Sequence, residues 1–110
     1  MSDCVHFTVD NDIVELKREW LNRWKFFTDM LGEGIEINKI EWTYTGKKEL
    51  KKWIKLNELI DEVVHRTKMK NDAKIYVYSD EIKYADVEKI VDYMQPIIDF
   101  ELIFVYIYTD

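Results

Sequence analysis

The chain has 110 residues, of which 47% are hydrophobic, and a formal net charge of −6, so it can build one core and is neither disordered nor low-complexity. We therefore expect a single domain over residues 1–110, and the acidic balance argues against a surface built wholly for nucleic acid. Its one cysteine, Cys4, excludes an intramolecular disulfide, and without a long apolar run or a signal pattern we expect a cytoplasmic protein with no membrane contact.

The first part of the chain predicts a strand followed by a long helix. Residues 5–9 alternate between apolar and polar side chains, as in a half-buried strand. Asp12 is suited to cap a helix from Ile13 to Leu31, because the apolar residues of this stretch then share one helix face. Phe26 lies on the opposite, polar face, so we expect its ring to be exposed and to contact a partner or a second copy of the chain.

The middle of the chain is locally basic, with eight Lys or Arg against five Asp or Glu in residues 47–72. A strand over residues 35–44, with a β-bulge at Asn38-Lys39, is predicted to turn at Gly46-Lys47 into a second strand. One face of this β-hairpin would carry Ile40, Trp42, Tyr44 and Trp53. A long helix starting at Lys47 is the alternative, and we reject it because it crowds lysines at the positive end of the helix dipole.

Three further elements and a final strand complete the prediction. Asn57 is expected to cap a short helix, and residues 73–78 to form a strand that precedes a helix from Tyr84 to Met94. Residues 100–108 are apolar on both alternating faces, which predicts a central strand parallel to residues 73–78. The predicted fold class is α+β or α/β, a single-domain mixed β-sheet with helices packed on it in the order β-α-β-β-α-β-α-β.

No motif with catalytic or cofactor-binding spacing occurs in the sequence, so no catalytic residue, metal site or cofactor is predicted. Cys4 and His6 share a strand face but lack a second pair of metal ligands. Four acidic residues lie where strands are predicted to end: Asp10, Asp12, Asp80 and Glu81. If those ends met, the carboxylates could hold Mg²⁺ for phosphoryl transfer, but helix caps and turns explain them without a metal.

Two further hypotheses come from different functional classes. The first is a small non-enzymatic binding or regulatory protein, inhibitor-like or adaptor-like as in phages and viruses, which acts through protein–protein contacts and could form a homodimer. Its expected partner-binding residues are Phe26, Trp42, Tyr44, Lys51, Trp53 and Lys55. The second is single-stranded nucleic-acid binding by the same basic aromatic hairpin, because rings stack on bases and lysines neutralise phosphates. The sequence leaves open whether the hairpin aromatics are surface or core residues.

Overall fold

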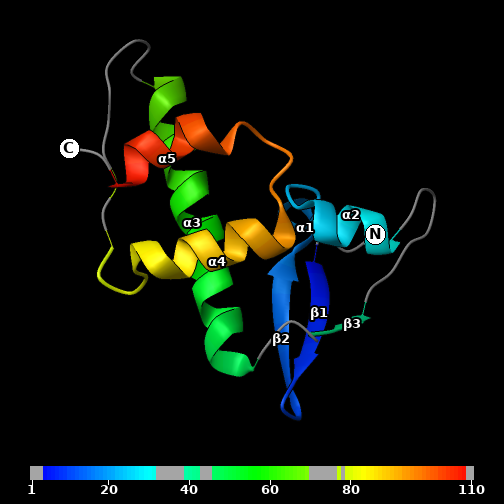
Figure 1. Cartoon of the computed structure of the whole chain (residues 1–110). Coiled ribbons are helices and arrows are strands. Elements are labelled where there is room, and N and C mark those ends of the chain that lie inside the picture. Colours follow the sequence, from blue (N-terminus) through cyan, green and yellow to red (C-terminus); the bar gives the residue numbers. More distant parts are fainter. Residues whose placement is uncertain (1–3, 32–38, 43–45, 70–76, 78, 109–110) are drawn as a thin grey trace.

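The structure is a computed structural model that describes residues 4–31, 39–42, 46–69, 77 and 79–108 of the chain. It is a mixed α+β fold, in which the described residues form one three-stranded sheet and five helices (Figure 1). The elements are β1 (Cys4–Val9), β2 (Asp12–Lys17), α1 (Arg18–Leu21), α2 (Lys25–Leu31), β3 (Lys39–Glu41), α3 (Lys47–Met69), α4 (Tyr84–Met94) and α5 (Phe100–Tyr108). The mixed sheet with helices agrees with the prediction. The predicted order of elements is not confirmed, because the described elements run β-β-α-α-β-α-α-α.

The sheet has the order β2-β1-β3, with β2 antiparallel and β3 parallel to β1. The predicted first strand is confirmed, but the helix predicted from Ile13 is wrong over its first part, which forms β2. Asp10 and Asn11 link β1 to β2 with φ angles of 48° and 67°, as the favoured two-residue hairpin turns require. Leu16 faces the core opposite Val5, while Ile13 is 70% exposed, a burial pattern that a helix from Ile13 would not give.

The predicted hairpin at Gly46-Lys47 is wrong, because residues 47–69 form the single helix α3. The β1–β2 turn supplies the negative charge that offsets the lysines at the start of α3. The Asp10 carboxylate accepts a hydrogen bond from the Lys47 backbone N–H at 3.2 Å, and Asp12 forms an ion pair with the Lys47 ammonium. Asn57 is not a cap but a fully buried residue within α3. The predicted bulge at residues 38–39 is not covered by the described residues, which show a strand only at 39–41.

The C-terminal part contains one confirmed and one wrong prediction. Helix α4 has the predicted bounds and ends before Pro96. Residues 100–108 form the helix α5 and not a central strand: the Asp99 carboxylate accepts a hydrogen bond from the Leu102 N–H at 3.3 Å, as an N-cap does. Leu102 is 59% exposed whereas Ile107 is buried, so α5 buries one side. Of the predicted strand 73–78, only Val77 is described; its N–H donates to the Tyr106 carbonyl at 2.7 Å.

All eight elements surround one hydrophobic core, in which Trp53 of α3 is central. Five rings have their centroids between 5.3 and 6.5 Å from the ring of Trp53: Phe7, Trp20, Trp24, Phe27 and Trp42. Helices α4 and α5 lie across α3, and α4 also contacts α2 (Figure 1). The core therefore joins the sheet, through α3, to the two C-terminal helices.

Polar contacts fix the segment of α1 and α2 on α3. Asp61 of α3 accepts a hydrogen bond from Trp20 Nε1 at 2.8 Å and forms an ion pair with Arg23. The Arg23 guanidinium also donates to the Asn57 carbonyl at 3.1 Å. Asp61 thus binds two side chains of the preceding segment and sets where it rests on α3.

Candidate functional site

The aromatic residues expected on a hairpin surface lie in the core. Trp53 is 0% and Trp42 6% exposed, and their rings contact each other at 5.7 Å. Neither ring can therefore stack on a base or meet a partner in this fold. Tyr44, the third expected aromatic, lies outside the described residues. The sequence left open whether these aromatic residues lie on the surface or in the core, and the structure shows both tryptophans in the core.

Phe26 is half-buried, so the prediction of an exposed ring is wrong. Its centroid lies 5.1 Å from that of Phe27 and 5.3 Å from that of Tyr93 of α4. The sequence wheel assumed one helix over residues 13–31 and could not show that α4 packs against α2. Phe26 therefore helps to join two helices, and the more exposed ring of this contact is Tyr93, at 52%.

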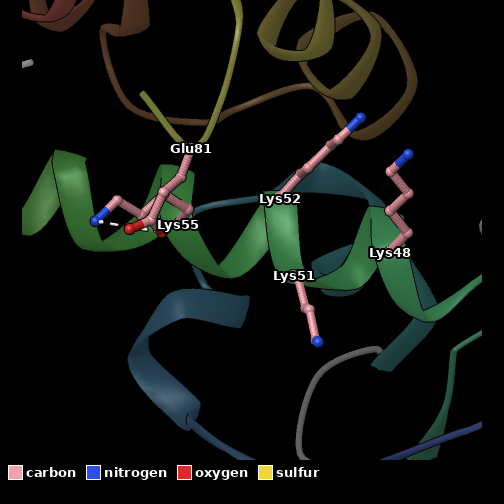
Figure 2. Close-up of a pocket in the computed structure, with 5 residues that line it drawn as sticks. All are labelled: Lys48, Lys51, Lys52, Lys55 and Glu81. Carbon is pink, nitrogen blue, oxygen red and sulfur yellow. Dashed lines mark ion pairs between the residues drawn. The ribbon is translucent and has the colours of Figure 1, made fainter. Parts of the chain in front are cut away.

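A basic pocket of about 270 Å³ lies along α3, lined by Lys48, Lys51, Lys52, Lys55 and Glu81. Figure 2 shows Lys48 and Lys52 extending to one side of α3, Lys51 to the other, and Lys55 turned toward Glu81. The pocket includes both lysines that the sequence marked as partner-binding, Lys51 and Lys55. It is the place where an anionic ligand would bind if the lysines were free to contact it.

Carboxylates of the same chain neutralise much of this basic pocket. Lys52 Nζ lies 2.9 Å from an Asp86 oxygen, and Lys55 Nζ lies 3.8 Å from a Glu81 oxygen. Lys48 and Lys51 form no ion pair with a described residue. Two of the four lysines are thus already bound, and the acids that bind them would repel a polyanion.

The charged state of the Lys52–Asp86 pair is favoured from both sides. Burial by itself raises the pKa of the Asp86 carboxyl, but hydrogen bonds from Lys52 and from the Lys83 backbone N–H outweigh it and lower that pKa. The hydrogen bond to Asp86 raises the pKa of Lys52, against the effect of burial. The pair therefore stays ionised over a wide pH range and contributes to holding α4 on α3.

Three of the four carboxylates considered for a metal site are divided between separate contacts. Asp10 and Asp12 bind Lys47 at the start of α3, whereas Glu81 lies beside Lys55. Within the described part of the chain, no group of three or more His, Cys, Asp or Glu side chains could hold a metal ion. The geometry gives no support to a magnesium site built from these residues.

A second feature is a groove between α4 and α5, which we call the α4–α5 groove. Its floor is Val87, Val91 and Phe104, and its rim carries Glu88, Asp92 and Glu101. Its volume is about 210 Å³. The Phe104 ring also meets the 49%-exposed Tyr84 edge to face, at 5.1 Å between centroids.

Sequence reasoning missed the α4–α5 groove because it assigned residues 100–108 to a strand. The signal on α4 was present: Val87 and Val91 are four residues apart and so lie on one helix face, with Glu88 and Asp92 beside them. The other wall could be recognised only after Asp99 was read as the cap of α5.

Comparison with known proteins does not identify a family for this chain. A scan against protein-family models gave no match, and searches of the curated proteins and of the solved structures gave none either. No helix within the described residues is both long and apolar enough to cross a membrane. Its function is therefore inferred from the residues and their geometry.

Proposed function

We propose that this chain is a non-enzymatic binding protein that contacts another protein through the α4–α5 groove. The observation that carries the proposal is an apolar floor that the described residues leave uncovered, with half-buried Val91 and Phe104 between two helices. Apolar surface rimmed by polar residues is typical of protein interaction sites. A cytoplasmic location is part of the proposal, since the lone Cys4 suits a compartment that keeps thiols reduced.

The groove replaces the aromatic hairpin as the expected binding surface. Burial of Trp42 and Trp53 removes the stacking platform that single-stranded nucleic-acid binding would need. Because they are buried, these two residues cannot contact a protein partner either. A protein partner can still bind to the surface of α4 and α5. Lys51 and Lys55 remain at the basic pocket, where Lys55 is paired with Glu81. Protein contact is therefore the hypothesis better supported by the exposed side chains.

Site-specific photo-crosslinking in native cell extract tests this proposal. A photoreactive phenylalanine derivative replaces Tyr84, which is exposed and contacts the groove residue Phe104. The control replaces Ile13, which is 70% exposed on the sheet. We expect one discrete protein adduct from position 84 and not from position 13. Equal adduct patterns from both positions, or an adduct with nucleic acid alone, would contradict the proposal.

A further inference from the structure

We infer that the α4–α5 groove takes a basic amphipathic segment of the partner, with an apolar side chain on the floor and Lys or Arg side chains against the rim. The inference rests on the proposed function, which states that the groove binds a protein but not the chemistry of that protein. It follows from the size of the groove, the chemistry of its floor and the charge of its rim.

The size of the groove favours a side-chain anchor over a whole small molecule. Its volume of about 210 Å³ falls below the roughly 300–1,000 Å³ typical of small-molecule sites. Val87 is fully buried, and Val91 and Phe104 are partly exposed, so the floor offers aliphatic and aromatic carbon to an incoming apolar side chain. Walls formed by two helices suit an amphipathic segment with apolar residues at helical spacing.

The rim of the groove carries negative charge that no ion pair within the described part of the chain neutralises. Glu88 and Asp92 are four residues apart on α4, a spacing at which like charges repel, and Glu101 comes from α5. All three side chains are exposed, and none forms an ion pair with a described residue.

Three acids elsewhere on the chain, unlike those of the rim, are paired with a lysine of the same chain. Asp12, Asp86 and Glu81 each lie against a lysine of α3. Lysine or arginine side chains of a partner would supply at the rim the positive charge that the lysines of α3 supply at these three acids. The net charge of −6 would also draw a cationic segment toward the protein.

The test uses three synthetic helical peptides and amide chemical shifts of the protein. The first peptide combines leucine at positions i, i+3, i+4 and i+7 with lysine elsewhere. The second has glutamate in place of lysine, and the third has serine in place of leucine. We expect the leucine–lysine peptide to shift the amides of Val91 and Phe104 and to bind more tightly than the other two, because only it matches both floor and rim.

Two variants with the same change in net charge separate the groove from general attraction. The groove variant is Glu88→Gln, Asp92→Asn and Glu101→Gln, and we expect it to bind the leucine–lysine peptide roughly tenfold more weakly, as three exposed ion pairs together would give. The control variant is Glu19→Gln, Asp29→Asn and Glu41→Gln, all exposed positions outside the groove. We expect less than a twofold change from the control. Equal weakening by both variants would overturn the inference.

The remaining outcomes distinguish this inference from the function on which it rests. If the glutamate peptide binds and shifts the groove amides instead, the basic partner is wrong while protein binding by the groove stands. If no peptide shifts the amides of Val91 and Phe104, the inference fails. The proposed function fails only if the adduct at position 84 is also missing.

Discussion

At the scale of single residues, two fully buried tryptophans differ in one hydrogen bond. Trp24 Nε1 donates to the Asn57 side-chain oxygen at 2.9 Å, and the Asn57 amide donates to the Trp53 carbonyl at 2.9 Å. The indole N–H of Trp53 has no hydrogen-bond partner among the described residues. Both side chains are 0% exposed, so the pair isolates the effect of hydrogen bonding from that of burial.

The same substitution at these two tryptophans should therefore have different costs. Trp24→Phe leaves the buried Asn57 oxygen without its donor, which adds about 1–3 kcal/mol to the lost packing. Trp53→Phe removes an unsatisfied donor together with part of the ring. We expect the free energy of unfolding in urea to fall further for Trp24→Phe, by at least about 1 kcal/mol. Equal losses would show that Asn57 gains another donor once the indole is gone.

At the scale of the helices, Asp86 is an N-terminal residue of α4 that also contacts α3. Its carboxylate accepts hydrogen bonds from the Lys83 backbone N–H at 3.1 Å and from Lys52 Nζ at 2.9 Å. These contacts lower its pKa in the folded chain below the ordinary value of 3.8. The charged form therefore stabilises the fold above pH 3.8, and the contribution is lost as the pH falls through the folded pKa.

Asp86→Asn tests this pH dependence. We expect the variant to be less stable than the parent chain at neutral pH, because Asn cannot form the ion pair with Lys52. The difference should shrink as the pH falls below 3.8, since the parent carboxyl is then losing its charge as well. Urea unfolding midpoints measured for both proteins from neutral to acidic pH give the comparison. A constant difference across that range would contradict the assigned role of the pair.

The sequence predicts correctly those elements whose secondary structure is determined by the periodicity of their own apolar residues. Strand β1 alternates strictly, and α4 has an apolar stripe with Pro96 beyond its end. The local sequence argues against α3, because the acids that offset its N-terminal lysines are Asp10 and Asp12, which are distant in sequence. No local pattern carries that contact.

The remaining errors concern stretches whose apolar residues fit both the two-residue period of a strand and the 3.6-residue period of a helix. Residues 100–108 are apolar at nearly every position, so they fit a buried strand and a helix equally well, and only the Asp99 cap separates them. Similarly, Ile13 and Leu16 fit a helix face, although the Asp10-Asn11 turn signals a hairpin. The assignment of residues 100–108 to a strand also hid the candidate site, because the α4–α5 groove exists only when these residues form a helix.

At the scale of the whole molecule, α3 contacts two groups of elements, and these groups also meet each other directly where α2 packs against α4. Trp53 of α3 packs in the aromatic cluster with β1 and α2, while α4 and α5 lie across α3. All four tryptophans are buried, and all precede α4 in the chain. Tryptophan fluorescence therefore reports on the aromatic core around Trp53, whereas amide signals of α4 and α5 report on the C-terminal helices.

The shared core predicts that both groups unfold in one transition. Ile90 of α4 is 1% exposed, and Ile90→Ala should cost about 2–5 kcal/mol by leaving a cavity. If the chain is one cooperative unit, this change lowers the urea midpoint of tryptophan fluorescence as much as that of the α4 and α5 amides. The exposed neighbour Glu88→Ala should change neither midpoint appreciably, which controls for the substitution itself. A shift confined to the amides of α4 and α5 would mean that the C-terminal helices unfold separately, and the expectation of a single domain would then be wrong.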